Sequence, residues 1–305
     1  MSHQPEATHA RRIRWPRWLA AGLALVVLAA AVVLVARWLR TLEPVQEFLF
    51  ANPGSYPLPE WAPVGFPAWL AWQHFFNAFF LVLIVRTGLQ SRFELQPPAL
   101  WTSRRNRRRR MSMTVWVHLA LDALWIVNGL LYVVLLLATG QWVRIVPTSW
   151  EVIPNALSAA LQYASLDWPL EHAWVNYNSL QQLSYFGVVF VAAPLAIVTG
   201  ARMSALWPRD ATRLNAAYPF SLAKAVHLPV MVLFIAFTVA HVALVLATDA
   251  LRNLNAIFTA RDASDGVGFV IFVVALLVIA AGWALVRPAI VDRIAAAFGD
   301  VMRRR

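Results

Sequence analysis

Six apolar runs, each close to twenty residues long, alternate with polar segments along this chain of 305 residues. The runs cover residues 18–37, 67–88, 115–138, 181–200, 221–248 and 267–287. A helix of about twenty apolar residues is long enough to cross the hydrocarbon core of a bilayer. The pattern therefore predicts an all-α fold, a polytopic membrane helix bundle with six transmembrane helices.

Composition supports this fold class. Hydrophobic residues make up 60% of the chain and charged residues only 13%, whereas soluble domains carry about 25% charged residues. The bundle is expected to be the single domain, with residues 1–17 as a polar N-terminal tail and 288–305 as a basic C-terminal tail. The first run is longer than the apolar part of a typical signal peptide and no clear cleavage site follows it, so we expect an uncleaved extra N-terminal helix.

The positive charge is concentrated on one side of the predicted bundle. Twenty Lys and Arg residues lie in the N-terminal tail, residues 89–114, residues 201–224 and the tail from Arg287, and only five lie on the alternate side. Basic residues concentrate in cytoplasmic loops. We therefore expect a multi-pass protein of the cell inner (plasma) membrane with both termini cytoplasmic. Because these residues flank the apolar runs, the net charge of +11 does not indicate nucleic-acid binding.

The chain contains no cysteine. This excludes thiolate-bound iron–sulfur clusters and the covalent attachment of a c-type haem. Any metal or haem must be held by histidine, methionine or carboxylate.

Histidines inside the apolar runs are the candidate ligands. His227 and His241 lie fourteen positions apart in one run, which returns to within about 40° of the same helix face and separates them by about 21 Å. The alternating topology places His74 towards the outer leaflet with His241, and His118 towards the inner leaflet with His227. Two histidines therefore share each depth, an arrangement typical of two b haems with bis-histidine ligation.

Two phrases accompany the histidines, RTGL at 86–89 and PLAIVTGARMS at 194–204. With them the chain resembles the integral cytochrome b subunits of bacterial respiratory formate dehydrogenases, nickel–iron hydrogenases and thiosulfate reductases, a cytochrome b561-like group. The resemblance covers residues 67–248 and implies a four-helix di-haem core. It implies that His74 and His241 bind the outer haem iron, and His118 and His227 the inner haem iron.

The resemblance also implies a function. The chain is expected to carry electrons across the membrane as a subunit of an oxidoreductase complex, without being its catalytic subunit. It would link the quinone pool to a molybdopterin oxidoreductase or hydrogenase, with an iron–sulfur subunit between them. The extra N-terminal helix inverts the four-helix core relative to formate dehydrogenase subunits whose first helix holds a ligand.

Three further charged residues are accessory candidates. Asp122 lies one turn after His118, where a carboxylate relays protons to a quinone, hydrogen-bonds a neighbouring helix or has a purely structural role. Arg86 and Lys224 lie near the inner ends of their helices, where they either pair with haem propionates or extend to lipid phosphate.

Membrane histidines also have uses without haem. They form hydrogen bonds between helices or line a polar pathway, so a haem-free proton-coupled transporter is the alternative function. His3 and His9 in the N-terminal tail and His172 in an outer loop are expected to be ordinary surface residues.

Overall fold

The computed structural model describes residues 17–168, 173–208 and 210–303. Within these ranges six helices are long and apolar enough to span a membrane, and the protein is 71% helical. The predicted fold class, an all-α polytopic helix bundle, is confirmed. His3, His9 and His172, and most of the N-terminal tail, lie outside the described residues.

The elements follow one another along the chain as α1 (Arg17–Leu39), α2 (Glu43–Ala51), α3 (Ala68–Phe93), β1 (Ala99–Ser103), β2 (Arg110–Ser112), α4 (Met113–Ala138), the 3₁₀ helix η1 (Gln141–Arg144), α5 (Val152–Ala164), α6 (Ser179–Phe186), the π-helix η2 (Gly187–Ala192), α7 (Ala193–Met203), α8 (Thr212–Ala217), α9 (Phe220–Thr259), α10 (Val267–Leu285), α11 (Pro288–Phe298) and β3 (Gly299–Arg303).

The bundle is built from two helix pairs. Helix α3 packs along α4, and α7 packs along α9, while α10 covers both α9 and α3. Long apolar segments form helices because lipid offers the backbone no hydrogen bonds, so each segment must satisfy its own. Polar residues mark where helices begin: the Ser112 side chain accepts a hydrogen bond from Val115 N at 3.2 Å at the start of α4, and Asn178 forms a capping box with Gln181 at the start of α6.

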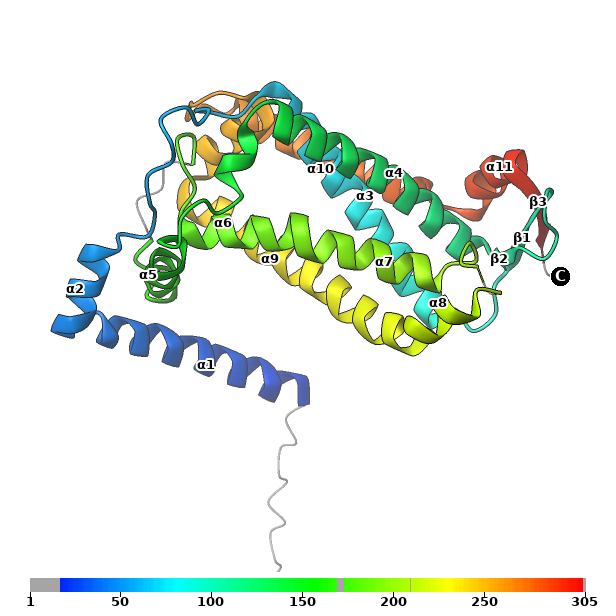
Figure 1. Cartoon of the computed structure of the whole chain (residues 1–305), viewed down its shortest axis with the longest axis horizontal. Helices are drawn as coiled ribbons and strands as arrows, with labels where there is room; N and C mark the ends of the chain where they lie inside the picture. Colours follow the sequence, from blue (N-terminus) through cyan, green and yellow to red (C-terminus); the bar gives the residue numbers. More distant parts are fainter. Residues whose placement is uncertain (1–16, 169–172, 209, 304–305) are drawn as a thin grey trace, which may run out of the picture.

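Helix α1 stands apart from these pairs (Figure 1). It contacts α5 near its C-terminal end, where Arg37 Nε donates to Ser165 O at 3.0 Å and Arg40 donates to Ser165 Oγ at 2.6 Å. Most of its apolar side chains are exposed. The extra N-terminal helix is therefore held by its polar end rather than by packing against the histidine-bearing helices.

A small sheet closes the opposite end of the bundle, which we call the inner end. Strand β1 lies between β2 and β3, antiparallel to both, and Trp101 of β1 is paired with Val301 of β3. The Trp101 ring is buried with Ala99, Met113 and Ala295. The pattern of apolar runs does not predict this sheet, and residues 288–305, expected to be a basic tail, contain the helix α11 and the strand β3.

Candidate functional site: two histidine pairs in the helix bundle

His74 of α3 and His241 of α9 lie next to each other and form the outer pair. Their ring centroids are 6.2 Å apart, and the ring planes are inclined by 54°. Two imidazoles that bind one metal ion from opposite sides, each at about 2 Å, have ring centres about 6 Å apart. The observed separation is compatible with two ligands of one ion.

Aromatic rings enclose the outer pair. Phe237 stacks on His241 with centroids 5.6 Å apart and planes within 9°, and Tyr185 of α6 meets the same imidazole edge on at 6.1 Å. Phe258 meets His74 edge on, also at 6.1 Å. The Nδ1 atom of His74 is buried and has no hydrogen-bond partner within the part of the chain that the structure describes. A buried, unpaired imidazole nitrogen is costly, and a metal ion is one group that would satisfy it.

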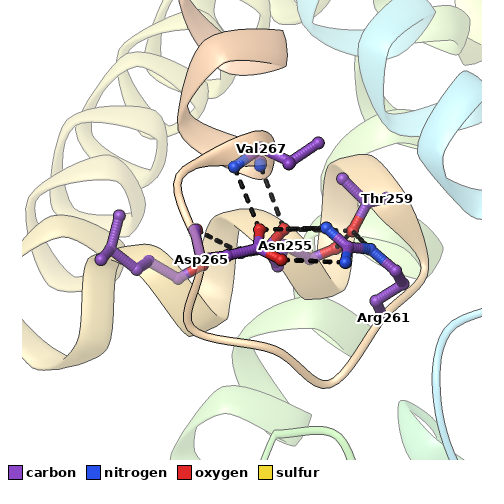
Figure 2. A network of polar contacts seen from close by, with 7 residues as sticks. Asn255, Thr259, Arg261, Asp265 and Val267 are labelled. Carbon is purple, nitrogen blue, oxygen red and sulfur yellow. Dashed lines mark hydrogen bonds and ion pairs between the residues drawn. The ribbon is translucent and has the colours of Figure 1, made fainter.

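Phe258 reaches His74 because α9 is kinked at its outer end. Asp249 departs from helical geometry, with φ −150° and ψ 78°, so the last turns of α9 take a new direction. A polar network then holds them to the start of α10 (Figure 2): the Asn255 side chain accepts from Gly268 N at 3.0 Å and donates to Asp265 O at 2.6 Å. Arg261 forms an ion pair with Asp265 at 2.9 Å. We call this network the outer clasp.

His118 of α4 and His227 of α9 form the inner pair, and each is bonded to a threonine on the preceding long helix. Thr87 Oγ1 lies 3.0 Å from His118 Nδ1, and Thr199 Oγ1 lies 2.8 Å from His227 Nδ1. Both threonines are buried, with 1% and 2% of their surface exposed. The two helix pairs α3/α4 and α7/α9 therefore present their histidines in the same way.

A glycine follows each of these threonines and lies against the same imidazole. A Cβ atom at Gly88 would be 3.2 Å from His118 Cε1, and one at Gly200 would be 3.4 Å from His227 Cε1. The distance at Gly88 is shorter than about nine in ten Cβ contacts, and the distance at Gly200 is at the short limit of ordinary van der Waals contact. Both imidazoles thus occupy space that a side chain at the glycine would begin to fill.

A contact between α4 and α9 in the middle of the bundle indicates that His118 and His227 lie on facing sides of their helices. Trp125 and Phe234 meet edge on with centroids 6.0 Å apart, and each lies seven residues after its inner histidine. Seven residues are about two helical turns, which returns to within about 20° of the same face. His118 and His227 are also close enough to interact electrostatically.

The accessory candidates have different surroundings. Asp122 Oδ2 lies 3.7 Å from His118 Nε2, and this carboxylate also interacts electrostatically with His227. Arg86 donates to Trp283 O and to Val286 O, the latter at 3.1 Å, and lies over the Trp283 ring at 4.7 Å. It therefore caps the C-terminal end of α10. Lys224 is exposed near the start of α9.

A buried arginine lies beyond the outer pair. Arg144 is 1% exposed, lies over the rings of Phe66 and Tyr177 at 4.8 and 4.9 Å, and donates to Gly65 O at 2.6 Å. Burial lowers the pKa of Arg144, and burial raises the pKa of the Tyr177 hydroxyl. Tyr177 in turn contacts Tyr185 at 5.0 Å, which joins this cluster to the rings around His241.

Sequence reasoning found the four histidines but missed the residues that surround them. The Thr-Gly dipeptide at 87–88 and 199–200 supports the resemblance, and its repetition near the ends of two helices is also a signal for these contacts. The seven-residue spacing of His227, Phe234 and His241 was a second signal. No pattern pointed to Phe258, because its contact depends on the kink at Asp249.

Among the described residues no group of three or more His, Asp or Glu side chains is arranged to hold a metal ion. The candidate sites are pairs of imidazoles. Comparison with family models, with curated proteins and with solved structures found no match to this chain.

Proposed function

We propose that this protein is a di-haem cytochrome b that carries electrons across a membrane. The observation that carries the proposal is the outer pair: two imidazoles from α3 and α9 with ring centroids 6.2 Å apart. The donor set fits haem b, since neutral imidazole is a usual axial ligand and the chain has no cysteine. The unpaired Nδ1 of His74 and the close approach of Gly88 and Gly200 to the inner imidazoles agree with pockets that hold a rigid group.

His74 and His241 would hold one haem, and His118 and His227 the other. Bound haem supplies a one-electron redox centre at each depth. The chain orients the imidazoles, and the rings of Phe237 and Phe258 exclude water from the outer pair. The spacing of His227 and His241 along α9 separates the two haem sites by about 21 Å. The edge-on pair Trp125–Phe234 fills the space between the levels.

The quinone part of the proposal is supported by a cavity near the inner pair. This cavity of about 320 Å³ has a mainly apolar lining, to which the polar side chains of Thr87, Gln90, Thr114, Arg287, Asp292 and Arg303 are added. Arg303 forms an ion pair with Asp292 Oδ2 at 2.7 Å. Thr87 also contacts His118, so a ligand there would lie beside the inner site. Asp292 Oδ1 is buried without a hydrogen-bond partner among the residues that the structure describes, and such an oxygen is available to a quinol hydroxyl.

Membrane side and partner are also part of the proposal. The excess of Lys and Arg on alternate connections supports cytoplasmic termini in a plasma membrane. The resemblance noted in the sequence supports a molybdopterin or hydrogenase partner, with an iron–sulfur subunit between them.

One observation favours the alternative of a haem-free proton-coupled transporter. Asp122 lies 3.7 Å from His118 Nε2 and interacts with His227, so a carboxylate and two imidazoles are grouped at one depth. Groups of this kind form proton relays in membrane proteins. The outer pair has aromatic neighbours instead, which a proton pathway does not require.

Haem quantification in the purified full-length protein tests the proposal. We expect a b-type reduced-minus-oxidised spectrum and two haems per chain by the pyridine haemochrome assay. The double variant His74→Ala/His241→Ala should keep one haem, whereas His74→Ala/His118→Ala should keep none, because the second removes one ligand from each pair. His172→Ala is the control and should keep both.

The contrary result is a folded protein without haem, obtained from cells with ample haem supply. Asp122→Asn should then abolish proton flux in vesicles if the transporter alternative is right.

A further inference from the structure

We infer that Thr87 and Thr199 are positioning residues that fix the tautomer of the two inner histidines and so tune a single redox centre. The inference rests on the proposed function. It assigns a role to two residues that the haem-binding proposal does not require. The evidence is the pattern of hydrogen bonds around each hydroxyl group.

Each threonine hydroxyl has one hydrogen to donate. Thr87 Oγ1 lies 2.8 Å from Leu83 O, closer than the 3.0 Å to His118 Nδ1. Thr199 Oγ1 lies 2.6 Å from Leu195 O, closer than the 2.8 Å to His227 Nδ1. A carbonyl oxygen can only accept, so each hydroxyl donates to its own helix four residues back.

We therefore assign the imidazole as the donor to the threonine, with the Ile84 carbonyl as a second backbone partner of His118. The hydroxyl proton goes to the carbonyl, so the hydroxyl oxygen accepts from Nδ1–H, which places the imidazole proton on Nδ1 and the lone pair on Nε2. In His118 this Nε2 lies 3.7 Å from Asp122 Oδ2, and that carboxyl group would turn away when a metal ion binds. Nε2 is then the atom able to bind a metal ion. The same logic applies to both inner histidines, although they lie on different helices and receive their threonines from different helices.

The repetition is itself an argument for a shared role. In both cases a Thr-Gly dipeptide near the inner end of one long helix contacts the histidine near the start of the next. In both cases the residue seven positions after the histidine, Trp125 or Phe234, takes part in the edge-on contact between these two rings. Among the described residues, His74 in the outer pair has no such acceptor on Nδ1. Both threonines thus act on the inner histidine pair, and the redox centre at the outer pair is the reference against which a change is measured.

A hydrogen-bond acceptor on Nδ1–H makes an imidazole a more basic ligand. A more basic ligand stabilises the ferric state more than the ferrous state, so it lowers the reduction potential. Removing either acceptor should raise the potential of the inner centre. Because both threonines act on the same centre, the two effects should fall on the same haem and add.

Potentiometric titration of the purified full chain tests this. Thr87→Val and Thr199→Val keep the shape of the side chain and remove the hydroxyl. Each should raise the reduction equilibrium constant of the same one of two haems roughly three- to tenfold, which is about 30–60 mV for one electron, and the double variant should show both shifts. Thr87→Ser and Thr199→Ser should restore the original potential.

Thr238→Val is the matched control, since Thr238 Oγ1 donates to Phe234 O at 2.8 Å within α9 in the same way but is not bonded to any histidine that the structure describes. It should leave both potentials unchanged. If a Val variant loses both haems, the reduction potentials of the Ser and Ala variants at that position are compared instead. These two side chains differ only by the hydroxyl oxygen, so their difference tests the hydrogen bond.

Two haems with unchanged potentials in the Thr87 and Thr199 variants would overturn this inference and leave the proposed function intact. Equal shifts of both haems, or a shift in Thr238→Val, would overturn it as well. A haem-free wild-type protein would instead overturn the proposed function on which it rests.

Discussion

The ring of Phe258 meets the imidazole of His74 edge on, with centroids 6.1 Å apart, although the two residues are far apart in sequence. The contact exists because α9 is kinked at Asp249 and its last turns are held to α10 by the outer clasp. Asn255 is the centre of that clasp and is fully buried. A structural feature at the end of the bundle therefore decides what covers the outer histidine pair.

Gly268 is the tightest point of the clasp. A Cβ atom there would lie 2.4 Å from Asn255 N and 2.5 Å from Leu254 C, and backbone atoms cannot move aside cheaply. We expect Gly268→Ala to lower the free energy of unfolding by about 2–3 kcal/mol, measured by thermal unfolding in detergent. Gly266→Ala is the control, because a Cβ atom there has no described neighbour within 4 Å. Equal stability of the two variants would contradict the close approach.

Gly88 and Gly200 should matter for the inner pair in a different way. An added methyl group at either position presses on an imidazole at 3.2 or 3.4 Å, which tilts the ring without unfolding the helix. Gly88→Ala should therefore reduce or shift the absorption of one haem in the reduced-minus-oxidised spectrum. Gly200→Ala should affect the same haem more weakly in the same measurement. Gly129→Ala and Gly187→Ala should behave as wild type, because a Cβ atom at either glycine has no neighbour within 4 Å among the described residues.

Phe234 packs in the middle of the bundle between the two levels. It is 6% exposed and belongs to a cluster with Ala192 and Val230. Truncation leaves a cavity, so Phe234→Ala should lower the free energy of unfolding by about 3–5 kcal/mol, measured by thermal or denaturant unfolding. The neighbouring Leu233 is 52% exposed, and Leu233→Ala should change stability far less. A similar loss in both variants would mean that Phe234 is not packed as described.

The outer clasp should weaken in acid. Hydrogen bonds from Arg261 and from Val267 N hold the pKa of the Asp265 carboxyl below its usual range. A group with a lowered pKa in the folded state contributes stability above its unfolded pKa of about 3.9, and loses it as the pH falls through the lower folded value. The unfolding temperature should therefore drop between pH 5 and 3 more steeply in wild type than in Asp265→Asn.

Two further variants check the origin of that pH dependence. Arg261→Gln removes the main donor to Asp265 and should flatten the profile in the same way. Glu151→Gln removes an exposed carboxylate elsewhere and should leave the steep profile unchanged. A profile for Asp265→Asn that runs parallel to wild type would exclude the ion pair as the cause.

The fold could be predicted because lipid makes hydrophobic length decisive. Each predicted apolar run has a corresponding helix, but several helices extend further, as α9 does to Thr259, since polar residues beyond the lipid continue a helix without an apolar signal. The sheet at the inner end could not be predicted. Its strands are three to five residues long, and β1 and β3 are separated by most of the chain.

The candidate site could be predicted in part. Histidine is rare at membrane depth, so His74, His118, His227 and His241 were visible in the sequence, and the haem assignment stays a prediction. The supporting residues were not visible because they are ordinary helix residues. Thr87 becomes distinctive only when its hydroxyl lies near His118, and that depends on the rotation of α3 against α4.

The position of β1 has a consequence for how the protein is made. This strand is synthesised between the second and third spans, but one of its two neighbours, β3, consists of residues 299–303 near the end of the chain. The sheet can therefore close only after all six helices have left the ribosome. The inner end therefore forms after the sixth span, and loss of β3 would leave one edge of β1 open and prone to pair with other chains.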